Sequence, residues 1–171
     1  RGGVPVPVGG ARDAEAARDA ASRAAFAACD MLVLSGGTSK VAGDLACRLV
    51  ARLGQPGIMA HGVALKPGKP LCLAVVDRAG RRPLPVAVLP GFPTSAIFTF
   101  HEFLAPVLRC LAGVRTPRDE VVRARLPMRV NSERGRTEYL LVGLVAGSQS
   151  GEWIAYPMGK GPIRVGLKAR V

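Results

Sequence analysis

Apolar residues follow two alternating patterns along the first two thirds of the chain. Short continuous runs at 31–34 and 86–89 are typical of strands that are buried on both faces of a parallel sheet. Elsewhere the apolar residues recur every three or four positions, at 45–53 and 97–111, which predicts helices that bury one face. Strands that alternate with helices predict an α/β domain with a largely parallel sheet.

Further elements follow from the same patterns and from local breakers. We expect extended or strand segments at 4–8, 58–65 and 71–76, and an alanine-rich helix at 11–28. Thr94 or Ser95 is the candidate N-cap of the helix at 97–111. Pro106 must kink or split that helix, because proline lacks the backbone donor that a helix interior needs.

The pattern changes after Gly113. Short strands are expected at 121–126, 137–144 and 153–156, with a turn at 147–151. The chain is therefore expected to form an α/β domain at 1–113 and a small β domain at 114–171.

The composition of the chain excludes some classes of protein and disfavours others. Hydrophobic residues make up 49% of the chain, too many for a disordered protein, and no apolar run is long enough for a membrane helix. The net charge of +12 suits nucleic acid, an acidic membrane surface or a phosphorylated small molecule, but arginine-rich usage across a genome explains it equally well. Aromatic residues are only 5%, which disfavours a base-stacking surface. The chain starts at Arg1 with no signal-peptide pattern, so we expect a piece of a longer protein.

The cysteines and histidines do not predict a metal site. Four cysteines lie far apart without a C-x-x-C pair, and the two histidines add no ligand spacing, which disfavours both zinc and a disulfide framework. Their mostly apolar neighbours predict buried thiols in a reducing cytoplasm. The residues concerned are Cys29, Cys47, Cys72, Cys110, His61 and His101.

Three loops carry the candidate chemistry. The segment 65–70 (Leu-Lys-Pro-Gly-Lys-Pro) places two lysines on a rigid Pro-Gly bend, where their ammonium groups attract an anion. The loops 35–39 (Ser-Gly-Gly-Thr-Ser) and 89–95 (Leu-Pro-Gly-Phe-Pro-Thr-Ser) each follow a buried strand and precede a helix. Ligands of open α/β sheets bind at that edge, where helix N-termini supply N–H groups for an oxyanion.

Each of these features alone also has an ordinary structural explanation. Glycine-rich βα turns are common, lysines beside a turn are often just solvated, and Asp44 suits the helix dipole as well as a magnesium ion. A nucleotide P-loop is excluded at 62–70, because five residues separate the glycines and proline replaces the Ser/Thr that would hold magnesium.

In combination and in this order, the three loops and Asp44 resemble the molybdopterin molybdotransferase family, to which the C-terminal part of gephyrin also belongs. The resemblance covers residues 4–113 and continues through 135–139 (Gly-Arg-Thr-Glu-Tyr). It implies a three-layer α/β domain whose first strand precedes Arg1, followed by a small β domain. It also implies an enzyme that inserts molybdate into adenylylated molybdopterin with magnesium, releasing AMP and molybdenum cofactor.

The resemblance also implies roles for individual residues. Asp44, Lys66 and Lys69 are the expected catalytic residues, and Asp44 and Asp13 are the expected magnesium ligands. The molybdate pocket is expected to consist of Ser39, Lys66, Lys69, Pro70, Ser95 and Arg136. The phosphate of molybdopterin is expected to contact Gly36, Gly37, Thr38, Gly91 and Thr94.

Departures from the family pattern keep a second function open. Phe92 stands where the family usually has asparagine, the run 40–43 differs from the usual small residues, and the Gly/Ser-rich segment expected after Gly161 is replaced by Pro-Ile-Arg. A molybdopterin or molybdate sensor that has lost turnover is therefore an alternative. The resemblance further implies a homodimer and a molybdopterin adenylyltransferase as a partner. The cysteines place it in the cytoplasm, and the composition makes nucleic acid an improbable partner and predicts no membrane segment.

Overall fold

The computed structural model describes residues 3–8, 24–35, 40–114, 121–132, 134–158 and 167–170, with the backbone alone for 40–45 and 167–170. The chain divides into two compact units, one of residues 1–63 with 68–116 and the other of residues 64–67 with 117–171. Each unit is described by itself. The division into separate domains at 1–113 and 114–171 stays a prediction.

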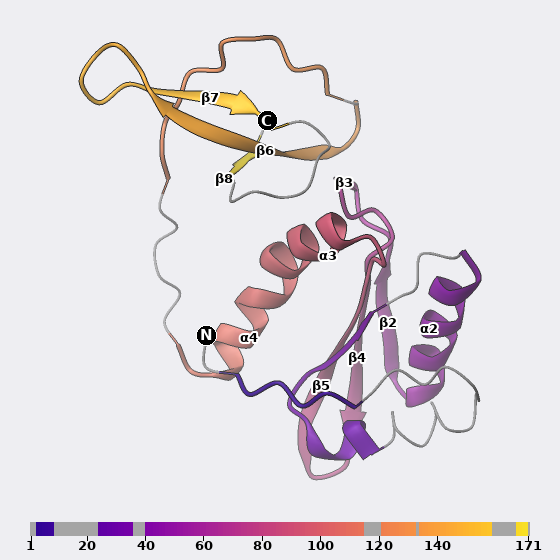
Figure 1. Cartoon of the computed structure of the whole chain (residues 1–171). Helices are drawn as coiled ribbons and strands as arrows, with labels where there is room; N and C mark the ends of the chain where they lie inside the picture. Colours follow the sequence, from indigo (N-terminus) through magenta and orange to yellow (C-terminus); the bar gives the residue numbers. More distant parts are fainter. Residues whose placement is uncertain are drawn as a thin grey trace. The chain divides into compact units, whose positions relative to one another are not determined.

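The first unit is built on a four-stranded sheet in the order β1-β5-β4-β2 (Figure 1). Its strands are β1 (Leu32–Ser35), β2 (Pro56–His61), β4 (Cys72–Arg78) and β5 (Arg81–Leu89). The α/β class is confirmed, but this sheet is mixed rather than largely parallel. Only β1 and β5 are parallel, because a tight turn joins β4 to β5 and a short loop returns the chain from β2 to β4.

The strand expected at 58–65 is two separate elements. β2 ends at His61, and Leu65–Lys66 forms the two-residue strand β3, which pairs with a strand of the second unit. Between them the backbone turns at Gly62, whose N–H donates to the Leu71 carbonyl at 2.8 Å. The hydrophobic run was a poor guide here because Val63 and Ala64 continue it without belonging to a strand.

The helices follow the predicted positions, with one difference at the start of α3 (Pro93–Thr99). Helix α2 (Lys40–Leu53) lies where the 45–53 pattern places it, and residues 24–28 are helical. The C-terminal helix is split, as Pro106 predicts, into α3 (Pro93–Thr99), a π-helical turn η1 (Phe100–Leu104) and α4 (Ala105–Leu111). The N-cap prediction was wrong: Phe92 is the N-cap, because Pro93 takes the first helical positions, for which its fixed φ is suited.

Two hydrophobic clusters lie on opposite faces of the sheet, and together they make three layers (Figure 1). On β5, Leu84, Val86 and Val88 face α2, whereas Ala87 on the alternate face packs against η1. β4 shows the same alternation, with Cys72, Ala74 and Val76 in the α2 cluster. The continuous apolar runs of these strands therefore arise from burial on both faces, which is what the sequence predicted.

The second unit is a small sheet centred on β6 (Thr137–Ala146). Its neighbours are β3, β7 (Trp153–Pro157) and β8 (Leu167–Arg170), of which only β3 is parallel to it. The strand predicted at 121–126 was wrong, because those residues are exposed and make only one bridge, between Arg125 and Ile154. β8 was not predicted, since its sequence alternates charged and small residues without an apolar run.

No helix in the described part of the chain is long and apolar enough to cross a membrane.

The four cysteines are free thiols, but they are not equally buried. Cys47 and Cys72 lie in the core, Cys29 is half-buried, and Cys110 is exposed on the last turn of α4, contrary to the prediction that all four are buried. Burial and a hydrogen bond with Cys47 raise the pKa of the Cys72 thiol from its ordinary 9.0 to about 12.

This raised pKa predicts a loss of stability at alkaline pH. The unfolded chain releases the Cys72 proton near pH 9.0, whereas the folded protein keeps it to about pH 12. The protonated Cys72 thiol therefore makes its full contribution to the free energy of unfolding below pH 9.0. This contribution is lost as the pH rises toward 12, by up to about 1.4 kcal/mol per pH unit. Urea unfolding of the wild type and of Cys72→Val at about pH 8 and about pH 10 measures it. The wild type should lose roughly 1 kcal/mol more than the variant, and equal losses would contradict the assignment.

Candidate oxyanion-binding site

Three chain segments of the first unit meet at one edge of its sheet. Ser35 at the end of β1 pairs with Leu89 at the end of β5, Val88 pairs with Cys72 at the start of β4, and Cys72 pairs with His61 at the end of β2. The loops after β1 and β5 and the turn before β4 therefore all leave the sheet at this edge.

The Pro-Gly turn at 67–70 is fixed by its backbone. Gly68 is buried with φ +128°, a conformation that only glycine adopts readily, and its carbonyl accepts from the Leu71 N–H at 3.2 Å. The Lys69 carbonyl accepts from the Val63 N–H at 2.9 Å. The main chain of Lys69 is thus held in place while its side chain and Pro70 are exposed to solvent.

Lys66 is held differently, by the second unit. It lies on β3 directly opposite Glu138 of β6, and its Nζ is 3.3 Å from Glu138 Oε1. Its side chain is 43% exposed. Lys66 is therefore a partly exposed cation in an ion pair, not simply a solvated lysine beside a turn.

The loop after β5 brings a hydroxyl and backbone donors to the sheet edge. Pro90 is buried and Gly91 is half-buried, and α3 begins immediately after Phe92. Thr94 and Ser95 lie half-buried in the first turn of α3, where the backbone N–H groups have no partner within the helix. The Thr99 hydroxyl donates to the Ser95 carbonyl at 2.8 Å, which ties this first turn to the next.

The predicted site residues fall into three groups. Lys69, Pro70, Gly91, Thr94 and Ser95 lie at the described edge of the first unit. Lys66 and Arg136 belong to the second unit, where Arg136 is exposed immediately before β6. Outside the described residues lie Asp13, Gly36, Gly37, Thr38 and Ser39, and of Asp44 only the backbone, in α2, is described.

The expected magnesium ligands belong to this last group. Among the residues that the structure describes, no cluster of three His, Cys, Asp or Glu side chains could hold a metal ion. Carboxylate oxygens such as those of Asp44 and Asp13 are the ligand type that Mg²⁺ prefers, and one or two of them suffice beside substrate oxygens.

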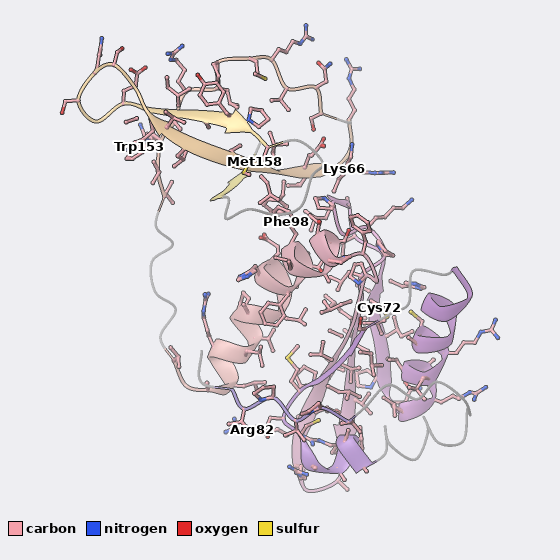
Figure 2. All side chains as sticks on the ribbon, in the orientation of Figure 1. Lys66, Cys72, Arg82, Phe98, Trp153 and Met158 are labelled. Atoms are coloured by element: carbon pink, nitrogen blue, oxygen red, sulfur yellow. The ribbon has the colours of Figure 1, made fainter. Side chains whose placement is uncertain are left out.

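Sequence reasoning missed two polar contacts, one in each unit. Glu138 was noticed only as part of a motif, because nothing in the sequence indicates that β3 and β6 pair. In the first unit, the His61 ring Nε2 lies 3.6 Å from the Cys47 Sγ. Cys47 in turn contacts Cys72, the fully buried residue of the first unit that Figure 2 labels. The departure at Phe92 is also visible, since this ring is 63% exposed at the start of α3.

Comparison with known proteins decides the family. The model of a family described as a probable molybdopterin binding domain matches residues 1–110. The chain belongs to this family. Its resemblance to the molybdopterin molybdotransferases is likewise confirmed by curated relatives. It is 29% identical over 133 residues to molybdopterin molybdenumtransferase 1 of Mycobacterium tuberculosis, and 31% identical over 141 residues to the molybdopterin molybdenumtransferase of a Nostoc species.

These matches cover most of this chain but only part of each relative. The two alignments cover 78% and 81% of the chain, and 30% and 31% of the relatives, so the chain spans about a third of their length. A molybdenum cofactor biosynthesis protein from Pyrococcus furiosus has a similar structure, with a TM-score of 0.53 at 25% identity over 84% of the chain and 42% of the other. A molybdopterin biosynthesis protein from Pyrococcus horikoshii shares the fold, with a TM-score of 0.57 at 20% identity over 92% of the chain and 35% of the other.

The role of the Pro-Gly turn can be tested by a substitution of Gly68 that leaves Lys66 and Lys69 unchanged. Gly68→Ala should weaken molybdate binding by about tenfold or more, because a side chain at φ +128° costs roughly 1–3 kcal/mol of strain and displaces the turn. Gly80→Ala is the matched control. Gly80 also has a positive φ, +67°, but it lies in the β4–β5 turn at the other end of the sheet, with open space around its added Cβ.

Equilibrium dialysis of molybdate against both variants of the full-length protein measures the difference. Equal affinities of the two variants would show that the rigid Pro-Gly bend does not shape the pocket.

Proposed function

We propose that the protein to which this chain belongs acts in molybdenum cofactor biosynthesis, as an enzyme that inserts molybdate into adenylylated molybdopterin and releases AMP. The relatives' names support the pathway and the transferase class. The residue-level observation that supports the proposal is the common sheet edge. The register of the four strands brings Lys69, Pro70 and the loop of Gly91 to that edge.

Molybdate is a tetrahedral dianion, so its site needs cations and neutral donors that approach from several directions. In this proposal Lys66 and Lys69 supply the cations, with Arg136 as a third. Ser39 and Ser95 supply hydroxyl groups, and Pro70 contributes an apolar wall.

The phosphate of molybdopterin is assigned to the two glycine loops. Gly91 allows close approach of the backbone, and Thr94 lies in the first turn of α3, where N–H groups point away from the helix. Gly36, Gly37 and Thr38 are the corresponding residues of the loop before α2. The phosphate subsite then lies at the same sheet edge as Lys69 and Pro70, the first-unit residues of the molybdate subsite.

Asp44 and Asp13 are the proposed magnesium ligands, and Asp44 is also a proposed catalytic residue. Bound Mg²⁺ would neutralise charge on the adenylyl phosphates and so favour departure of AMP. The contribution of this chain is to hold the carboxylate of Asp44 on a helix that begins directly after the phosphate loop.

We further propose a cytoplasmic homodimer that receives its substrate from a molybdopterin adenylyltransferase. A molybdate or molybdopterin sensor without turnover is the second candidate. It is favoured by the exposed ring of Phe92 at the N-cap of α3, where the family usually has asparagine. Calorimetry separates the two functions, because a sensor releases binding heat without consuming adenylylated molybdopterin.

The two lysines provide the direct test of the enzyme. In the full-length protein, Lys66→Ala and Lys69→Ala should each lower magnesium- and molybdate-dependent AMP release by about 10²–10³, since each removes a preorganised charge from the reacting anion. Chromatography of released AMP measures this.

Arg82→Ala is the control for charge alone. Arg82 is an exposed cation of the same sheet, but it lies at the far end of β5 from the site (Figure 2). Undiminished AMP release in both lysine variants, or an equal loss in the arginine variant, would show that the proposed pocket is misplaced.

A further inference from the structure

Lys66 and Glu138 are neighbours because of the backbone and not only because of their charges. β3 pairs Leu65 with Thr137 and Lys66 with Glu138, and the Thr137 N–H donates to the Ala64 carbonyl at 2.9 Å. Leu65 is buried, with 5% of its surface exposed, and so anchors this short strand. The two charged residues are therefore held opposite each other by the register of a parallel pair.

The ion pair is asymmetric in its burial. Lys66 is 43% exposed, whereas the Glu138 side chain is only 16% exposed. Glu138 Oε1 contacts the lysine at 3.3 Å, but Glu138 Oε2 is buried without a hydrogen-bond partner in the described part of the chain. An ionised carboxylate oxygen can accept two hydrogen bonds, and leaving it unsatisfied opposes folding. This pair is therefore poorly explained as a device for stability alone.

We propose that Glu138 is the internal counter-ion of Lys66: it neutralises the lysine while no ligand is bound and competes with an incoming oxyanion for the ammonium group. The inference rests on the proposed function, since that function takes Lys66 as an anion-binding residue. Glu138 acts through Lys66 and is a positioning residue.

The negative charge of Glu138 should weaken the binding of an oxyanion to Lys66. A carboxylate that close to the ammonium group repels a dianion that binds to the same group, so Glu138 lowers the affinity of the site for oxyanions. Weak binding of the anion is compatible with catalysis. Interactions that stabilise the bound substrate and the transition state equally do not raise the turnover rate. Removing the charge of Glu138 while keeping its shape should therefore tighten oxyanion binding.

The chain offers a matched control pair in the same unit. Arg125 Nε lies 3.2 Å from Glu152 Oε1, and the two side chains are 63% and 26% exposed. Glu152→Gln removes the same charge from a similar ion pair, but it does so on the hairpin of β6 and β7 and not beside Lys66. Any effect of net charge alone appears in both glutamine variants.

The first measurement needs no ligand. In the full-length protein, the rate at which an amine-reactive ester acylates Lys66 near neutral pH is followed by mass spectrometry of peptides. Glu138→Gln should raise this rate severalfold, because the neutral amide stabilises the unreactive ammonium form less than a carboxylate does. Glu152→Gln should leave it unchanged, and an unchanged rate in Glu138→Gln would overturn the proposal.

The second measurement is equilibrium dialysis of molybdate and of sulfate. Glu138→Gln should bind both anions about threefold to tenfold more tightly than the wild type or Glu152→Gln, and Glu138→Ala must change the affinity in the same direction. In a Lys66→Ala background the gain from Glu138→Gln should disappear, because the effect acts through the lysine. Weaker binding by Glu138→Gln, or a gain that persists without Lys66, would overturn the counter-ion role.

AMP release separates this inference from the proposed function. A wild type that binds anions as described but releases no AMP refutes the proposed enzyme and leaves the role of Glu138 standing. A wild type that releases AMP while Glu138→Gln behaves like Glu152→Gln refutes only the role of Glu138. Absence of anion binding in the wild type and in Glu138→Gln overturns both.

Discussion

Burial of β4 and β5 on both faces is the constraint on which the first unit depends. Leu84, Val86 and Val88 pack toward α2, and Ala87 packs toward η1 from the same strand. Sliding β5 by one residue would exchange these faces and place the cluster residues against the wrong helix. The register of the sheet is therefore fixed by packing. Because that register also decides which loops share an edge, the core positions the candidate site.

The sequence predicted the parts of the fold that depend on local patterns. The apolar runs of β1 and β5, the helix that ends before Gly54 and the split at Pro106 follow from burial and from the missing proline donor, which are local properties. Strand direction was mispredicted because an apolar run has the same composition in parallel and antiparallel sheets. The N-cap was misplaced because Pro93 suits the first helical positions and so starts the helix before the hydroxyl residues.

The candidate site shows the same division. The Pro-Gly bend and the loop after β5 could be located from sequence, since glycine, proline and their neighbours determine them locally. The pairing of β3 with β6 could not, because it joins residues about seventy positions apart and rests on two backbone partners. Glu138 was missed for this reason, although its motif was recognised. Long-range pairing of very short strands leaves almost no hydrophobic pattern to detect.

The two lysines of the Pro-Gly segment are consequently not equivalent, although the sequence presents them as a symmetrical pair. Lys69 is anchored through its carbonyl to Val63 in the first unit and carries an exposed side chain. Lys66 is anchored by strand pairing in the second unit and faces a carboxylate at 3.3 Å. An exposed lysine attracts an anion at long range, but solvent screens that attraction. A lysine beside a mostly buried carboxylate attracts a distant anion less strongly, because the carboxylate cancels part of its charge. Its interaction with a bound anion depends more on whether that anion displaces the carboxylate. In the proposed site, Lys69 is therefore the lysine that attracts the anion, and Lys66 is the lysine whose charge Glu138 neutralises until an anion competes for it.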